Sequence, residues 1–242
     1  MLKQLFRNVG LHVSKASSVP FGLDAYEDIL ALRPDIQIAF DVGANIGQTV
    51  KKIRTIFPNT MIHSFEPVPE TFEQLTRNVV RYSNVECYRC AIGEVDGNVE
   101  ITVSETTGQN TISASAKPGV PRITVPTRTI ESVCTDQGID QIDVLKIDTE
   151  GYELSVLRGA QKMLTSGAVR FVLAECEFVR NPVEPHGNFF EIADFLLPLG
   201  YRVVAFYSGG VDGSGWVWGD VLFALPLSAR PVSCSPFGRW PA

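Results

Sequence analysis

Short apolar runs alternate with amphipathic segments over the first hundred residues of the chain. Residues 36–42 form an apolar run typical of a buried strand, and residues 50–57 carry apolar side chains at helical spacing. Residues 61–65 and 69–82 repeat this strand-and-helix pattern, and residues 85–92 predict a third strand. The alternation predicts parallel strands joined by right-handed crossovers.

The pattern then changes. Residues 98–104 and 123–129 alternate like antiparallel strands and flank a Ser/Thr/Gly-rich segment, which predicts an inserted hairpin. The strand-and-helix pattern resumes with helices at 130–137, 152–164 and 189–197, strands at 143–148, 170–177, 201–207 and 220–225, and a glycine loop at 209–215. The last strand pair predicts an antiparallel edge. The sequence therefore predicts an α/β fold with an open, mostly parallel sheet, an antiparallel edge strand, helices on both faces and an inserted β-hairpin.

Three regions follow from this pattern. Residues 1–35 predict an N-terminal helical cap, in which Asp24 is placed to cap a helix with Glu27 three residues later. This cap could cover the substrate side of the sheet or pack on its flank. Residues 36–228 form the main domain, with the insert at about 98–128, and the Pro/Ser-rich residues 229–242 predict a loose tail.

Composition narrows the function classes. The chain has 242 residues, of which 45% are hydrophobic and 20% charged, as expected of a soluble globular domain. Its net charge of −6 argues against nucleic acid as the main partner, and no apolar stretch is long enough to span a membrane. The start of the chain does not resemble a signal peptide. Among five cysteines, Cys87 and Cys90 form a C-x-x-C, but no second pair follows to complete a zinc site, so we expect reduced thiols and a cytoplasmic location. The oligomeric state, a homodimer included, stays open.

A glycine-bearing turn follows the first predicted strand. It contains Asp41, Gly43, Asn45 and Gly47, and such turns present backbone to ligands at the carboxyl edge of an α/β sheet. We expect the two glycines to leave room for a bound molecule to approach the main chain. A dinucleotide site would need a glycine where Asn45 stands. Asp41 is a poor neighbour for phosphate and a good one for an ammonium group.

Carboxylates end the next strands. Glu66 closes the second strand, where an acidic residue can accept both hydroxyls of a ribose. Asp148 ends the fourth strand, and Glu175 and Glu177 share one face at the end of the fifth. Because these strands should be neighbours, Asp148 and one glutamate are expected to converge. Converging carboxylates predict either a general base with a raised pKa or a Mg²⁺ site.

Other polar residues near this edge have two interpretations. His186, in the loop after the fifth strand, is a further candidate base because the pKa of histidine lies near neutrality. Glu150 and Glu153 are expected in the first turn of the next helix, where acidic residues stabilise the helix dipole without any other role. His12 and His63 lie outside the expected crevice and are interpreted as structural.

Four segments together resemble the FkbM-type methyltransferases, a class I group that depends on S-adenosylmethionine (SAM). They are FDVGANIGQT, SFEPVPETFEQL, VLKIDTEGYELSVLRGA and FVLAECE, and the resemblance covers residues 36–177. It implies a bound SAM. The implied contacts are Asp41, Gly43, Ala44, Asn45 and Gly47 for the methionine part, Glu66 with Pro67 for the ribose, Cys90, Ala91 and Ile92 for the adenine, and Asp148 beside the methyl group. The family pattern often has a histidine where Glu177 and Phe178 stand here.

The sequence thus predicts a SAM-dependent methyltransferase. The resemblance implies O-methylation of a sugar or secondary metabolite, with a small molecule or glycan as partner. In-line displacement needs a base for the hydroxyl proton, and the candidates are Asp148, Glu175 and His186. A less favoured form of this mechanism has a bound Mg²⁺ that lowers the pKa of the acceptor hydroxyl. An NAD-dependent dehydrogenase and a non-catalytic binding module on the same fold are the alternatives. Trp216 and Trp218 are expected to help shape the substrate pocket.

Overall fold

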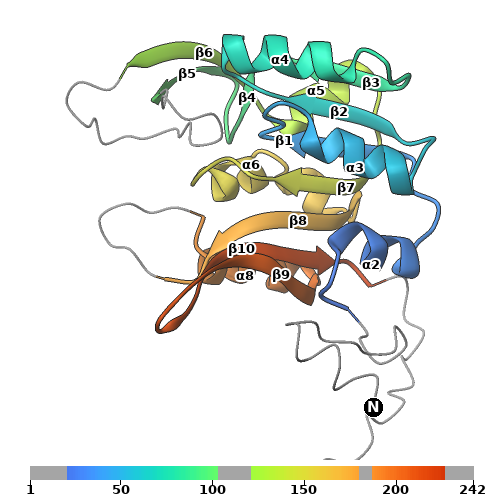
Figure 1. Ribbon diagram of the computed structural model, residues 1–242, viewed down its shortest axis with the longest axis vertical. Coiled ribbons are helices and arrows are strands. Elements are labelled where there is room, and N and C mark those ends of the chain that lie inside the picture. The colour runs from blue at the N-terminus through green and yellow to red at the C-terminus, as the bar shows by residue number, and fades with distance from the viewer. Residues whose placement is uncertain (1–20, 103–120, 180–186, 227–242) are drawn as a thin grey trace, which may run out of the picture.

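The computed structural model describes residues 21–102, 121–179 and 187–226, and Figure 1 shows their arrangement. A seven-stranded sheet runs through the molecule in the order β3-β2-β1-β7-β8-β10-β9. Its strands are β1 (Ile38–Val42), β2 (Met61–Phe65), β3 (Val85–Tyr88), β7 (Ile142–Ile147), β8 (Val169–Glu177), β9 (Arg202–Asp212) and β10 (Gly215–Ala224). Strands β3, β2, β1, β7 and β8 are parallel, as predicted, and β10 is antiparallel to both of its neighbours. The antiparallel strand lies one position inside the edge, and β9 is outermost.

Helices cover both faces of this sheet. They are α2 (Ala25–Leu32), α3 (Gln48–Ile56), α4 (Pro69–Val79), α5 (Ile130–Gln137), α6 (Glu153–Arg158), α7 (Gln161–Thr165) and α8 (Phe189–Leu196), followed by the 3-10 turn η2 (Leu197–Leu199). Two buried clusters result, one between the sheet and α2 to α4, the other between the sheet and α5 to α8. Strand β1 contributes side chains to both clusters, because Ala39 packs in the first cluster and Phe40 in the second. By the same alternation the buried Asp41 lies on the face covered by α2 to α4.

The inserted hairpin forms a small sheet of its own. Strands β4 (Ala91–Ile92), β6 (Arg122–Arg128) and β5 (Gly97–Thr102) pair in that order, with β5 antiparallel to β6. The predicted hairpin is therefore confirmed, and its loop lies outside the described residues. The predicted third strand at 85–92 divides into β3 and β4, because β4 leaves the main sheet to pair with β6.

The predicted helix at 152–164 is interrupted, so α6 and α7 are separate helices. The interruption lies at Gly159, where a Cβ atom would come within 2.0 Å of the carbonyl oxygen of Gly93. Glycine at this position lets the start of α7 approach the segment that leads into the insert. The break therefore serves the contact between the main domain and the inserted sheet.

The predicted glycine loop at 209–215 is wrong. Most of it is paired strand, because β9 continues to Asp212 and β10 begins at Gly215. A Cβ on Gly209 would lie 1.9 Å from the carbonyl oxygen of Trp218, so glycine allows the two strands to approach closely. The hairpin turn lies beyond the carboxyl end of β8 and projects at the lower left of Figure 1.

The described part of the predicted N-terminal cap is helix α2. Asp24 caps it as predicted, since its side chain accepts hydrogen bonds from the backbone N–H groups of Tyr26 and Glu27. Tyr207 of β9 donates a hydrogen bond of 2.8 Å to Asp28, which ties the helix to the edge of the sheet. Helix α2 thus packs on the face that also carries α3. Residues 1–20 and the predicted tail lie outside the described part of the chain.

Two negative findings apply to the described residues. None of their helices is long and apolar enough to cross a membrane. Their cysteines, Cys87, Cys90, Cys134 and Cys176, are free thiols, and the last three are buried.

Candidate cofactor and catalytic site

A cavity of about 290 Å³ opens at the carboxyl ends of β1, β2, β7 and β8. Its wall includes Gly43 and Asn45 from the turn after β1, Glu66 from the end of β2, and Asp148 and Glu175 from the ends of β7 and β8. Ligands of open α/β sheets bind at this edge, outside the carboxyl ends of the strands. The volume is near the lower limit of small-molecule sites.

Backbone hydrogen bonds join the three loops that form the cavity floor. The N–H groups of Gly43 and Ala44 both donate to the carbonyl oxygen of Phe65, at 3.1 and 2.9 Å. The N–H of Asp148 donates to the carbonyl oxygen of Val42 at 3.0 Å. The turns after β1, β2 and β7 therefore hold one another in place, and the cavity wall is formed before any ligand arrives.

The glycines of the turn after β1 are required by the protein chain itself. Gly43 has a φ of 76°, and a Cβ there would lie 1.7 Å from the carbonyl oxygen of Asp148. Gly47 has a φ of 94°, and a Cβ there would lie 2.9 Å from Val79. The expectation that both glycines clear space for a ligand is therefore wrong in its reason, because the space is filled by neighbouring backbone and by α4.

Glu66 lines the cavity with only 6% of its surface exposed. Its Oε1 accepts a hydrogen bond from the N–H of Val68 at 2.9 Å, and its Oε2 accepts one from the N–H of Asn45 at 3.0 Å. Burial raises the pKa of Glu66, and these two hydrogen bonds act in the opposite direction. Each oxygen keeps a free lone pair, so the carboxylate can accept two neighbouring hydroxyls, as a ribose presents them.

Apolar side chains line the wall beside Glu66. Ala91 and Ile92 come from β4, as predicted, and Cys90 precedes them. Ile101 of the inserted hairpin completes this wall, which the sequence did not predict. Ile101 alternates with polar neighbours in the insert, which is the available sequence signal, but no local pattern shows that the hairpin folds back to the cavity.

Asp41 does not reach the cavity. Its side chain is fully buried, and its partner is the ammonium of Lys146, with Nζ at 3.5 Å from Oδ1. The two residues are adjacent because β1 and β7 pair in the register that sets Asp41 opposite Lys146. An ammonium beside Asp41 is thus supplied by the protein, and a direct contact of Asp41 with a ligand stays a prediction.

Lys146 also reaches the catalytic edge. Its Nζ lies 3.1 Å from Oδ2 of Asp148 and 3.5 Å from the carbonyl oxygen of Gly43. Burial alone would lower the pKa of Lys146, but the charges of Asp41 and Asp148 outweigh burial and raise it. Lys146 is therefore an ammonium that neutralises part of the acidic charge beneath the cavity. A lysine inside an apolar run was the available sequence signal, and it was missed.

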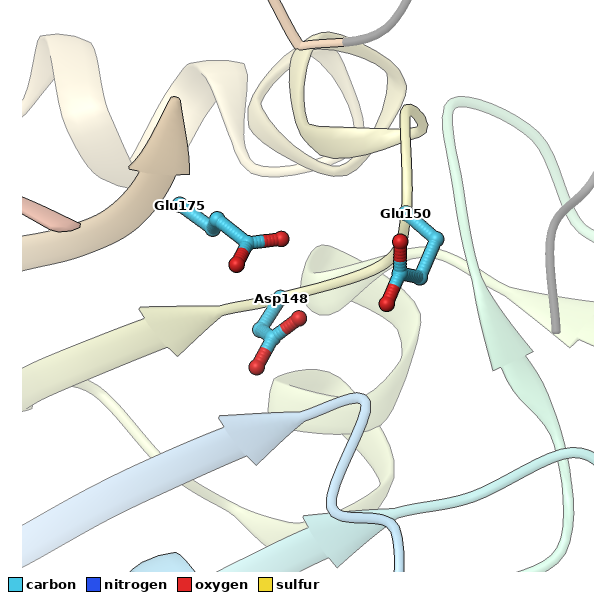
Figure 2. A group of neighbouring side chains, drawn as sticks. All are labelled: Asp148, Glu150 and Glu175. Carbon is cyan, nitrogen blue, oxygen red and sulfur yellow. The ribbon is translucent and has the colours of Figure 1, made fainter. Parts of the chain in front are cut away.

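Three carboxylates of the cavity wall gather together, and Figure 2 shows them facing one another. One oxygen from each of Asp148, Glu150 and Glu175 lies within 4.8 Å of the others. The predicted convergence of Asp148 with Glu175 is confirmed, whereas Glu177 does not join them. Burial, and then the charges of Asp148 and Glu150, raise the pKa of Glu175 to about 8. Carboxylate oxygens at this spacing suit a hard cation, but Lys146 already neutralises Asp148, and we assign no metal here.

The loop between Asp148 and α6 is held by Glu153. Its Oε1 accepts hydrogen bonds from the N–H of Thr149 at 2.9 Å, from the Thr149 hydroxyl at 2.9 Å and from the N–H of Gly151 at 3.1 Å. Glu150 has a φ of 53° and lies in the turn before α6, so its expected place in the first helical turn is wrong. The carboxylate of Glu153 fixes the turn that points Glu150 at the cavity.

The family model of the methyltransferase FkbM domain matches residues 41–203. The chain belongs to the FkbM methyltransferase family. The predicted family and fold class are confirmed, and with them SAM as the methyl donor. Membership in a methyltransferase family also leaves the dehydrogenase alternative without support.

Two curated relatives and one solved structure illustrate the range of similarity. The chain is 24% identical over 191 residues to the 2-O-methyltransferase NoeI of Sinorhizobium fredii, covering 72% of this chain and 76% of NoeI. It is 30% identical over 139 residues to the hexuronic acid methyltransferase AglP of Haloferax volcanii, covering 57% of this chain but only 55% of AglP. An rRNA methylase from Streptococcus thermophilus shares the fold, with a TM-score of 0.50, 9% identity and coverage of 83% of this chain and 93% of that one.

The cavity of the methyltransferase fits SAM. The buried Glu66 suits the ribose, and the apolar wall of Ala91, Ile92 and Ile101 suits the adenine. Gly43 and Asn45 line the cavity together with the carboxylates of Asp148 and Glu175, where the methionine part would lie. Pro67 and Asp148 also line the cavity, as predicted. Ala44 and Gly47 lie behind its wall with Asp41, so these three residues shape the site without lining it. His186 falls outside the described residues.

Proposed function

We propose that this methyltransferase transfers the methyl group of SAM to a hydroxyl oxygen of a sugar or secondary metabolite. The observation that carries the proposal is Glu175, a carboxyl in the cavity wall beside Asp148, whose pKa is raised to about 8. A general base for an alcohol works best with a pKa near the working pH. The similarity to NoeI, a 2-O-methyltransferase, and to AglP, a hexuronic acid methyltransferase, favours an oxygen acceptor on a sugar.

The residues divide the work by position. When bound, SAM supplies a methyl group already activated by its sulfonium. Glu66 and the turn after β1 orient the donor, so that catalysis depends mainly on alignment. With the donor in place, Glu175 would take the proton of the acceptor hydroxyl. Asp148, held by Lys146, lies beside it. His186 remains an alternative base by prediction.

Isothermal titration tests the donor site. S-adenosylhomocysteine should bind and NADH should not. Glu66→Ala should weaken that binding about tenfold to a hundredfold, since hydrogen bonds to a charged group contribute about 1.5–3 kcal/mol. Glu70→Ala, which removes an exposed carboxylate from the first turn of α4, is the control and should leave binding unchanged.

Two results would contradict the proposal. Unchanged binding in Glu66→Ala would show that the ribose assignment is wrong. Binding of S-adenosylhomocysteine without methyl transfer to any sugar or hydroxylated metabolite in a radiolabelled screen would favour the non-catalytic binding module. A cytoplasmic location is part of the same proposal.

A further inference from the structure

The donor cavity ends at β8, and this limits where an acceptor can bind. The apolar wall and Glu66 lie toward β2 and β4, while the last lining residue on the other side is Glu175. In the sheet the next strand after β8 is β10. If the proposed function holds, on which this inference rests, the acceptor hydroxyl must reach Glu175 from the side of β10.

Strand β10 presents a tryptophan and a carboxylate on that side. Its register against β8 is uninterrupted, with Asp220 opposite Glu175 and Trp218 opposite Glu177. Directly opposed residues share a face, and so do residues two apart on one strand. The side chains of Trp218 and Asp220 therefore lie on the same face of the sheet as Glu175.

The indole of Trp218 has a prepared place on this face. A Cβ on Gly210 of β9 would lie 2.3 Å from the indole Nε1 and 2.8 Å from Cδ1, so the ring rests where glycine leaves the strand bare. Even so, 44% of Trp218 is exposed. A large aromatic surface that is held in position over β9 and left open to solvent on the face of Glu175 is typical of a ligand-binding wall.

Trp216 provides an internal comparison because it lies on the opposite face. Its ring would contact a Cβ on Gly219 at 3.1 Å, and it meets the ring of Phe178 edge-on at 6.1 Å. A register shift between Trp216 and Trp218 accompanies this change of face. The two tryptophans are similarly exposed, at 48% and 44%, but only Trp218 shares the face of Glu175.

We infer that Trp218 and Asp220 form the acceptor subsite and that it receives an uncharged saccharide ring. An indole face can stack on the apolar C–H face of a sugar ring, and the carboxylate of Asp220 can accept hydrogen bonds from its hydroxyls. The carboxylates of Asp148, Glu175 and Asp220 lie at this edge, after β7, on β8 and on β10. Lys146 pairs with Asp148, and the charges of Lys146 and Lys52 act on Asp220, so the carboxylates outnumber the cations. Like charges placed together are costly, so a uronic acid is disfavoured.

The test uses the whole protein and a panel of probes. Methyl glucoside, methyl rhamnoside, N-acetylglucosamine and glucuronic acid are offered with radiolabelled SAM, and KM and kcat are measured for those methylated. Trp218→Ala should raise KM for the best neutral saccharide about tenfold, as expected for a buried-face aromatic contact, with the affinity for S-adenosylhomocysteine unchanged. Trp218→Phe should bring KM most of the way back to the value of the unmodified protein. Trp216→Ala, the matched control, should leave KM within about twofold.

Several outcomes would overturn the inference. Equal effects of Trp216→Ala and Trp218→Ala on KM would indicate a general effect on the hairpin. Preference for glucuronic acid would contradict the charge argument. Transfer to none of the saccharides, while S-adenosylhomocysteine still binds, would refute the saccharide subsite and leave the donor site intact. Absence of S-adenosylhomocysteine binding would instead refute the proposed function. Thermal unfolding of each variant separates these results from loss of folding.

Discussion

Lys146 contacts two carboxylates, and the structure predicts which contact contributes more to stability. The side chain of Asp41 is 0% exposed and that of Lys146 is 11% exposed, whereas that of Asp148 is 37% exposed. Removing one partner of a buried pair costs about 3–5 kcal/mol, because the other charge stays buried without compensation. An ion pair that water reaches contributes about 0–1 kcal/mol. We therefore expect Lys146→Met to destabilise the protein mainly through Asp41.

Two double-mutant cycles measure this directly. The cycle of Lys146→Met with Asp41→Asn should give a coupling free energy of about 3 kcal/mol or more, and the double variant should regain much of the lost stability. The cycle of Lys146→Met with Asp148→Asn should give less than about 1 kcal/mol. Urea unfolding followed by circular dichroism supplies the free energies. Distance alone would predict the opposite order, because Lys146 lies 3.1 Å from Asp148 and 3.5 Å from Asp41. A coupling free energy with Asp148 as large as that with Asp41 would therefore refute the argument from burial.

Two further predictions concern the catalytic edge and the turn after β1. Because burial raises the pKa of Glu175 to about 8 in the folded state, from a reference of 4.5, its contribution to stability is full below pH 4.5 and is lost as the pH rises through 8. The methylation rate should rise over the upper part of that pH window as Glu175 loses its proton. Glu175→Gln should lower kcat about 10²- to 10⁴-fold and flatten the pH profiles of both the rate and the stability. A pH–rate profile unchanged by Glu175→Gln would exclude Glu175 as the general base. Gly43→Ala should unfold the protein or lower the free energy of unfolding several times more than Gly138→Ala. Both glycines have a positive φ, but only at Gly43 would a Cβ atom collide with backbone. Gly138→Ala should cost about 1–2 kcal/mol in urea unfolding, and equal losses in the two variants would contradict the contact of Gly43 with Asp148.

Much of the fold could be predicted because its signals are local. Strand ends, the cap at Asp24 and the inserted hairpin all follow from periodicity and turn chemistry within a few residues. The convergence of Asp148 and Glu175 followed from one further rule, that neighbouring parallel strands end at the same edge. These predictions depend on the order of elements and not on the details of side-chain contact.

The features that the sequence did not predict depend on contacts between distant segments. The pairing of Asp41 with Lys146 requires the register of β1 against β7, which no local pattern contains. The same holds for Gly43, whose neighbour is the backbone of Asp148, and for the strand at 209–212, where glycines suggest a loop unless the indole of Trp218 is known to lie against them. In each case the sequence shows the residue type, but the tertiary partner of that residue decides its role.

The hairpin of β9 and β10 is attached to the rest of the sheet through β8 alone. Because alternate residues keep the same face, this hairpin can grow or shrink at its turn by two residues at a time while Trp218 and Asp220 stay opposite Glu177 and Glu175. The loops after β1, β2 and β7 take no part in such a change. A protein of this kind can therefore acquire a different acceptor by altering one hairpin, and its methyl-donating half need not change with it.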